Sequence, residues 1–155
     1  MARLSFSCIF QSGIQNFIRP GWCPGIRSLH GHQETWKCIE NTEERMREIL
    51  NGLYRLVQDD DTGSFYDVHL ITNDFIRILV FTWAEWLDVI EIKLHPEITY
   101  VKSFSTGLFP LSIPFACLLN VIFFWVPFLD KGLNKERIEK LRHRMALQLE
   151  VGGIN

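Results

Sequence analysis

The feature that most constrains this chain is an uncharged apolar segment of 27 residues, Ser103–Leu129. A segment of this length could cross the hydrocarbon core of a bilayer as one helix. Each proline removes a backbone donor that a single spanning helix needs. We therefore expect an apolar hairpin or a kinked helical insertion that lies against lipid, with Trp125 at headgroup depth. The residues that disfavour one straight helix are Gly107, Pro110, Pro114, Asn120 and Pro127.

The large apolar side chains of this segment are the expected contacts with membrane lipid or with an apolar protein partner. The expected contact residues are Leu108, Phe109, Leu111, Ile113, Phe115, Leu118, Leu119, Val121, Ile122, Phe123, Phe124, Trp125, Val126 and Phe128.

Length and composition indicate one domain with an ordinary core. The chain has 155 residues, of which 47% are hydrophobic, 22% are charged and 13% are aromatic. A chain of this size can bury a sizeable core and is short for two domains. The net charge of -2 gives no reason to expect nucleic acid as a partner. The oligomeric state is left open by these quantities.

Residues 1–33 differ in charge from the rest of the chain. They contain three arginines and no acid, whereas the remainder has 13 basic and 18 acidic side chains. An Arg- and Ser-containing head without acids is typical of a mitochondrial transit peptide, although Pro20 and Pro24 interrupt it. The alternatives are a secretory signal, for which Leu4–Phe10 is short and broken, and a poorly packed arm. We predict that residues 34–150 form one domain that is intracellular and membrane-associated, with a mitochondrial location as an option.

The middle of the chain predicts an α+β fold. Apolar residues recur at helical spacing over Thr42–Val57, with Asn41 or Thr42 as the cap. Four β-rich runs follow, and their connections are too short for parallel crossovers. We expect an antiparallel β-meander of about four strands, packed against this helix and a C-terminal amphipathic helix. The four runs are Phe65–Thr72, Phe75–Trp83, Trp86–Leu94 and Ile98–Ser105.

The C-terminal helix is expected from Asn134 to about Gln148. Ile138, Leu141 and Met145 share one face, and basic residues surround them. A basic helix next to an apolar segment is what an anionic membrane surface attracts, although a solvated helix face is an equally ordinary explanation.

The cysteines and the acidic cluster give no reason to expect a metal or a cofactor. Cys8, Cys23, Cys38 and Cys117 form no C-x-x-C pair, so we interpret them as free thiols. A zinc site from Cys23, His30, His32 and Cys38 would have the right ligand types at the wrong spacing. Asp59–Asp61 lack the alternation of a calcium loop and fit a solvated turn.

Three segments resemble an uncharacterised family of small domains. They are Trp86–Lys93 (WLDVIEIK), Ile98–Ser105 (ITYVKSFS) and Asp130–Arg142 (DKGLNKERIEKLR). They are similar to the family called domain of unknown function fourteen-ninety-nine, where a strand like F-V-D-D-V-E-F precedes I-x-V-R-S-x-S and S-D-x-G-x-N-x-x-R. The resemblance spans about Glu34 to Met145. This sequence departs from the family pattern at two points: Val89 replaces the second acid, and the apolar insertion precedes Asp130. The family has no established activity, so the resemblance implies none for this chain.

The candidate ligand-binding residues come from these segments. They are Asp88, Lys102, Ser103, Ser105, Asp130, Asn134 and Arg137. Asp88 falls on the apolar side of its strand, so we expect it to pair with Arg137 across the sheet and the last helix. Gly132 would permit a positive-φ turn and Asn134 would cap that helix, which is the structural alternative to a ligand site.

No residue pattern identifies a reaction. Lys102 and Ser103 would point to opposite faces of a strand, and no carboxylate pair has a fixed separation. The first hypothesis is a non-catalytic, membrane-associated domain that presents a binding surface on its sheet and its first helix. The alternative is a small-ligand-binding protein or enzyme with a polar pocket around Asp88, Lys102 and Arg137. A third option is an adaptor whose apolar segment binds another protein.

Overall fold

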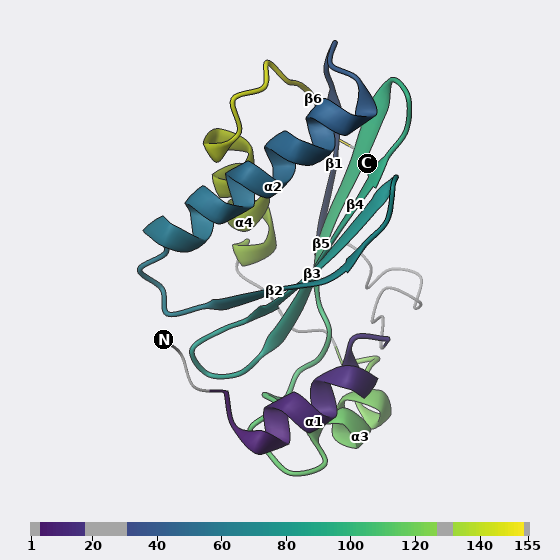
Figure 1. Cartoon of the computed structure of the whole chain (residues 1–155). Coiled ribbons are helices and arrows are strands. Elements are labelled where there is room, and N and C mark those ends of the chain that lie inside the picture. Colours follow the sequence, from purple (N-terminus) through teal and green to yellow (C-terminus); the bar gives the residue numbers. More distant parts are fainter. Residues whose placement is uncertain (1–3, 18–30, 127–131, 154–155) are drawn as a thin grey trace.

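The computed structural model describes residues 4–17, 31–126 and 132–153. Over these ranges the chain is an α+β structure, with helices on both faces of a six-stranded antiparallel sheet of order β2-β3-β4-β5-β1-β6 (Figure 1). The strands are β1 (Gly31–Lys37), β2 (Phe65–Ile71), β3 (Phe75–Phe81), β4 (Leu87–Leu94), β5 (Ile98–Ser105) and β6 (Glu150–Gly153). The helices are α1 (Phe6–Gln15), α2 (Thr42–Asp59), α3 (Ala116–Ile122) and α4 (Leu133–Arg144).

The predicted meander corresponds to strands β2 to β5, which pair in sequence order through short turns. The prediction of about four strands is wrong for the whole sheet, because β1 and β6 extend it beyond β5. β1 pairs with β5 over its full length, and β6 pairs with β1 over four residues. Neither strand had a clear signal: β1 is mostly polar (GHQETWK), and β6 is short and half glycine (EVGG).

Helices α2 and α4 cover one face of the sheet (Figure 1). α2 begins as predicted, because the Asn41 carboxamide accepts a hydrogen bond from the Glu44 amide at 2.9 Å. The helix buries Ile49, Leu53 and Leu56, whereas Val57, which was predicted on the buried face, is exposed. Gly132 precedes α4 with φ +80°, which agrees with the predicted positive-φ turn.

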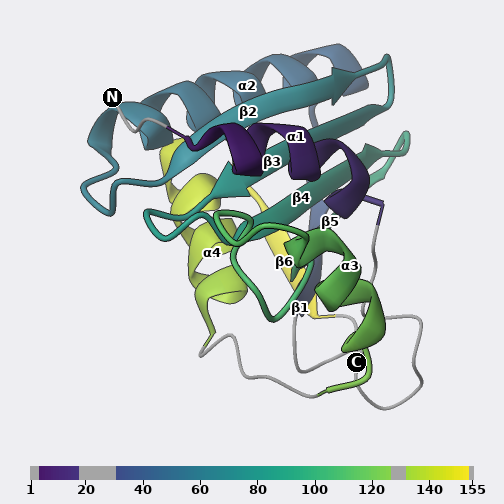
Figure 2. The same ribbon diagram turned by 90° about the horizontal axis from the view of Figure 1, so that it is seen from below.

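The opposite face of the sheet carries a second core, made with α1, α3 and the loop between β5 and α3 (Figure 2). Because side chains alternate along a strand, β4 sends Ile90 and Ile92 to the α2/α4 side and Leu87 and Val89 to the other. The second core consists of Cys8, Leu79, Phe81, Leu87, Val89, Phe104, Leu111 and Ala116.

The predicted apolar hairpin or kinked helical insertion does not form in residues 103–126, the described part of Ser103–Leu129. Its first three residues complete β5, and a loop then leads to the short helix α3. The loop packs on the sheet because Leu111 is fully buried there and the Leu111 amide donates to the Glu85 carbonyl at 2.9 Å. Within residues 4–17, 31–126 and 132–153, every helix is too short or too polar to span a bilayer.

Ordered elements lie on both sides of the boundary that the charge change predicted at residue 33. α1 is a ten-residue helix whose Cys8 is completely buried, and β1 begins at Gly31. The helix begins at a Ser5 cap, whose hydroxyl accepts from the Cys8 amide at 3.1 Å. Residues 4–17 therefore contribute to the core, contrary to the expectation of a poorly packed arm, while an import role for residues 1–33 stays a prediction.

Candidate functional site

Asp88 and Arg137 form the predicted ion pair. Asp88 on β4 accepts a hydrogen bond from Nη1 of Arg137 on α4, and both side chains are almost fully buried. A charge in such a position is stable only when it is paired and hydrogen-bonded. The pair therefore joins α4 to the middle of the sheet.

Three more of the candidate residues meet beside this pair. The Ser103 hydroxyl donates to Asn134 Oδ1 at 2.6 Å, and Asn134 Nδ2 donates to the Ser105 hydroxyl at 3.1 Å. The prediction that Asn134 caps the last helix is wrong, since Gly132 occupies the cap position. Asn134 is instead fully buried and bridges two residues of β5. These groups use their hydrogen-bonding capacity on one another, which favours a structural role.

Lys102 does not join this cluster. Ser103 and Ser105 face α4, so the alternating neighbours Lys102 and Phe104 face the other side of the sheet. The Lys102 ammonium lies 4.9 Å from the centre of the Phe104 ring. The predicted pocket around Asp88, Lys102 and Arg137 therefore does not form, and the candidate Asp130 lies outside the described residues.

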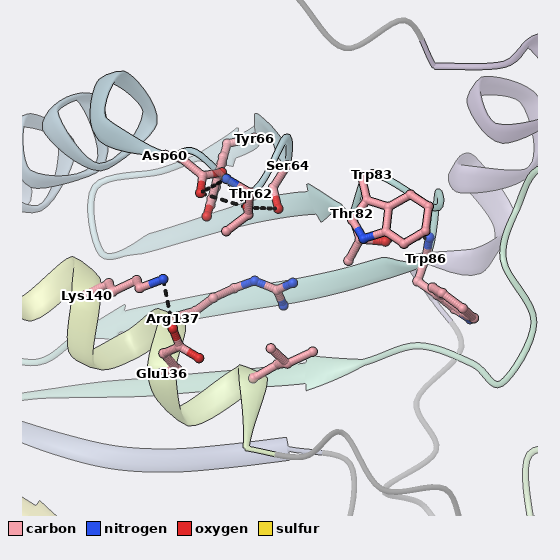
Figure 3. A pocket seen from close by; sticks show the side chains of 11 residues that line it. Asp60, Thr62, Ser64, Tyr66, Thr82, Trp83, Trp86, Glu136, Arg137 and Lys140 are labelled. Atoms are coloured by element: carbon pink, nitrogen blue, oxygen red, sulfur yellow. Dashed lines mark hydrogen bonds and ion pairs between the residues drawn. The ribbon is translucent and has the colours of Figure 1, made fainter.

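A pocket of about 250 Å³ does open beside Arg137, with different partners (Figure 3). Its walls come from α4, from the loop before β2 and from the turn between β3 and β4. Sequence patterns missed it because its polar residues come from loops, from strand β2 and from a helix face that only the tertiary structure brings together. Besides Arg137, the lining includes Asp60, Thr62, Ser64, Tyr66, Thr82, Trp83, Trp86, Leu133, Glu136 and Lys140.

Tyr66 forms part of the floor of this pocket. Burial raises the pKa of Tyr66 to about 12, and the negative charge of Asp60 adds to the shift, whereas Arg137 opposes it by its charge and by a hydrogen bond. The phenol is therefore neutral at physiological pH and keeps its proton available for hydrogen bonding.

The second candidate site is an apolar surface on α1 and α3, which lie side by side on the face of the sheet away from α2 and α4 (Figures 1 and 2). α1 is inverted relative to an ordinary surface helix. Its buried side chains are Cys8, Gln11 and Gln15, whereas its large apolar side chains face outward. The exposed set on and after α1 is Phe6, Ile9, Phe10, Ile14 and Phe17, with Phe6 at 84% and Phe10 at 72% exposure.

The polar side chains of α1 hold the helix in this orientation. Gln11 Nε2 donates to the Leu111 and Ile113 carbonyls at 3.1 and 2.9 Å, and Gln11 Oε1 accepts from the Cys117 amide at 2.9 Å. Gln15 Nε2 donates to the Thr106 carbonyl at 2.7 Å. These bonds satisfy backbone groups of the loop and of the start of α3, so the inward polar face has a definite structural purpose.

α3 continues the apolar surface. Phe115 stands at its start with φ +62°, in the left-handed region, and is 72% exposed. Most of the predicted membrane-contact residues are exposed here, but Leu111 is not, because it is buried against the sheet. Phe109 is also half-buried in that core, and Phe128 lies outside the described residues. The exposed apolar residues of this part are Ile113, Phe115, Leu118, Val121, Ile122, Phe123, Phe124 and Trp125.

The basic residues of α4 do not form a free positive surface. Each Lys and Arg of the helix lies within 4 Å of a carboxylate, and α4 is on the opposite face of the sheet from α1 and α3 (Figure 1). The structure therefore removes the reason to expect this helix at anionic headgroups. The pairs are Lys135–Glu139, Arg137–Asp88, Lys140–Glu136, Arg142–Glu34 and Arg144–Asp59.

The thiols and acids of the described residues do not assemble a metal site. Cys8, Cys38 and Cys117 are free, and the described ranges contain no group of three or more His, Cys, Asp or Glu side chains that could hold a metal ion. Burial, and to a smaller extent the charge of Glu85, raise the pKa of the Cys8 thiol to about 12. Such a thiol is a poor nucleophile. Cys23 and His30 of the predicted zinc set lie outside the described residues.

Comparison with models of protein families, with curated proteins and with solved structures found no match to this chain. The resemblance to domain of unknown function fourteen-ninety-nine therefore stays a prediction. The two candidate sites are the pocket beside Arg137 and the apolar surface of α1 and α3, and both are defined by the structure alone.

Proposed function

We propose that this protein is a non-catalytic domain that binds peripherally to lipid bilayers through the apolar surface of α1 and α3. In this arrangement α1 and α3 lie in the interfacial layer, and α2 and the sheet edges remain free to bind other molecules. The observation that carries the proposal is the inverted helix α1, whose glutamines face the protein and whose phenylalanines face outward.

The size of the exposed surface supports an apolar partner. Each large apolar side chain that moves from water into hydrocarbon gains about 1.5–3 kcal/mol when it is fully buried. More than ten such side chains are exposed on and around α1 and α3. Contiguous exposed apolar patches on soluble proteins commonly mark a protein or membrane interaction site.

Two features favour lipid over a protein as that partner. The segments that carry the surface, residues 4–17 and 103–126, contain no charged residue, whereas a typical protein interface has a polar rim with charged anchors such as arginine. Exposed tryptophans also border the surface: Trp125 follows α3, and Trp86 is tied to the Leu108 carbonyl by its indole N–H at 3.1 Å. Tryptophan is enriched at the boundary between hydrocarbon and water.

Flotation of the full chain with phosphatidylcholine vesicles tests the proposal. We expect the wild-type protein to float with the vesicles, and we expect Phe10→Glu and Ile122→Glu each to lower the bound fraction at least tenfold. Both residues are exposed, so the substitutions should leave the fold intact.

Ile39→Glu is the matched control, because Ile39 is a fully exposed apolar residue outside the α1/α3 surface. It should float like the wild type. If the wild-type protein stayed in the aqueous fraction as a stable monomer, lipid binding would be excluded. If it remained off the vesicles as a defined oligomer that Phe10→Glu dissociates, the surface would be a protein interface instead.

A ligand-binding role is the second candidate, and the pocket beside Arg137 is the observation that favours it. Buried Arg137 and partly buried Tyr66 reach this pocket from different elements, so its floor is well fixed.

A further inference from the structure

The pocket beside Arg137 has walls of opposite charge (Figure 3). α4 supplies the guanidinium of Arg137 and the ammonium of Lys140, and the loop before β2 supplies the carboxylate of Asp60. The hydrogen bond that the Lys140 ammonium donates to the Glu136 carboxylate raises the pKa of Lys140; desolvation opposes this shift, and the negative charges of Glu136 and Asp60 add to it. Two cations and two acids line the pocket, so the formal charges of the lining balance; Asp88, which pairs with Arg137, is not part of the lining. This balance disfavours a ligand with a large net charge of either sign.

The rim of the pocket is aromatic. Trp83 belongs to the turn between β3 and β4 and is 79% exposed although it borders a cavity. The turn is held firmly: Glu85 has φ +63°, and its carboxylate accepts from the amide and the hydroxyl of Ser5 at 2.7 and 2.6 Å. An indole that projects from a fixed turn beside a pocket and is open to solvent can receive a cation on its ring face.

The floor of the pocket suits an anionic oxygen. A guanidinium has five N–H donors in a planar fork. Among the described residues, Arg137 bonds to Asp88 and Tyr66, and its side chain still reaches the pocket lining. Arginine is the side chain that most often recognises phosphate in this way, and the nearby ammonium of Lys140, which also pairs with Glu136 at 2.8 Å, adds a second positive group.

We propose that this pocket binds a zwitterionic phosphate ester of the phosphocholine or phosphoethanolamine class. The phosphate lies against Arg137 and Lys140, and the ammonium lies over the Trp83 ring near Asp60. The volume of about 250 Å³ suits a group of this size better than a drug-sized ligand.

The source of this group is the headgroup of a phospholipid, and this part rests on the proposed membrane function. The turn between β3 and β4 is joined to the α1/α3 surface by two sets of hydrogen bonds. Glu85 accepts from Ser5, and the Trp86 indole N–H donates to the Leu108 carbonyl. When the apolar surface enters a bilayer, the turn therefore lies at the level of the headgroups.

Titration of ¹⁵N-tryptophan-labelled full-length protein with phosphocholine tests the pocket. We expect a saturable shift of the Trp83 indole resonance, and we expect binding at least tenfold weaker for inorganic phosphate or choline alone. Trp83→Ala and Asp60→Asn should each weaken phosphocholine binding at least tenfold. Trp125→Ala, on the apolar surface, should leave it unchanged. Lack of a saturable shift, equal binding of phosphate alone, or unchanged affinity in Trp83→Ala would each overturn the proposal.

Vesicles distinguish the lipid from the free ester. The wild type should prefer phosphatidylcholine to phosphatidylglycerol vesicles, and Trp83→Ala should lose this preference. Vesicle binding by the wild type without a headgroup preference would overturn the lipid source while leaving the proposed membrane function intact. Phosphocholine binding without vesicle binding would overturn the membrane function and leave the pocket as a site for a soluble ester.

Discussion

Asp88 of β4 and Arg137 of α4 form a buried ion pair that joins the last helix to the sheet. Removing one partner would leave an uncompensated charge, so we expect Asp88→Asn and Arg137→Met each to destabilise the fold by about 3–5 kcal/mol. The double variant should be less damaged than the sum of the single variants. Urea unfolding of the four proteins in the cycle measures this coupling.

Lys135→Met is the control for this cycle, because Lys135 forms an exposed pair with Glu139. A surface pair contributes under about 1 kcal/mol. Simple additivity of the Asp88 and Arg137 substitutions would mean that the two side chains act independently.

The orientation of α1 predicts an unusual pattern of stability changes. Gln11→Leu leaves the buried Cys117 amide without its partner and removes one of the two donors to each of the Leu111 and Ile113 carbonyls, so it should destabilise by about 1–3 kcal/mol. Phe10→Ser removes an exposed side chain and should change the unfolding free energy by less than about 0.5 kcal/mol. An ordinary amphipathic helix gives the reverse order. Urea unfolding in the absence of lipid distinguishes the two orientations.

Removal of residues 1–17 should expose the second core, because Cys8 packs among Leu79, Val89 and Phe104 there. We expect the truncated chain to have a lower thermal midpoint and increased binding of a hydrophobic dye. An unchanged midpoint would show that α1 is not part of the stable fold. Differential scanning fluorimetry on the truncated and full chains provides the comparison.

Tyr66 predicts a loss of stability at alkaline pH. Its pKa is raised to about 12 in the folded protein by burial, from 10.0 in the unfolded chain. Between these values the folded state holds a proton that the unfolded state has released, so the unfolding free energy falls as pH rises. The contribution of Tyr66 is fully present below pH 10.0 and is lost as pH rises through about 12.

Tyr66→Phe should therefore flatten the decline of stability between pH 10.0 and about 12 relative to the wild type. Tyr54→Phe is the control because Tyr54 is mainly exposed, and it should decline like the wild type. If the unfolding free energies of Tyr66→Phe and the wild type declined in parallel, the Tyr66 phenol would be exposed to water in the folded protein. Chemical denaturation across this pH range measures the difference.

Local signals in the sequence were sufficient for the meander and for α2. β5 has the predicted bounds, Ile98–Ser105, because a β-branched and aromatic run lies between turns. α2 begins at the predicted cap, and Asp88 reaches Arg137 because an acid on the apolar side of a strand needs a buried partner. Each of these predictions depends on residues that are close in sequence or on one strong physical requirement.

The remaining features depend on contacts between distant segments. The pairing of β1 with β5 compensates for the polar sequence of β1, and α1 is inverted only because the loop after β5 offers carbonyls to Gln11 and Gln15. The pocket likewise combines α4 with two turns. The length and lack of charge of Ser103–Leu129 identified the apolar segment but placed Leu111 in lipid, whereas the sheet provides the hydrophobic environment of Leu111.

Quenching of Trp125 by brominated lipid tests the membrane account most directly. Trp125 is exposed after the end of α3. Its fluorescence is obtained by subtracting the emission of Trp125→Phe from the emission of the wild type. With phosphatidylcholine vesicles brominated on the acyl chains near the headgroups, the account predicts that this difference signal is strongly quenched in the wild type. It should not be quenched in Phe10→Glu. Trp125 emission that is unaffected by brominated lipid, from protein that has sedimented with the vesicles, would contradict the claim that α1 and α3 face the bilayer.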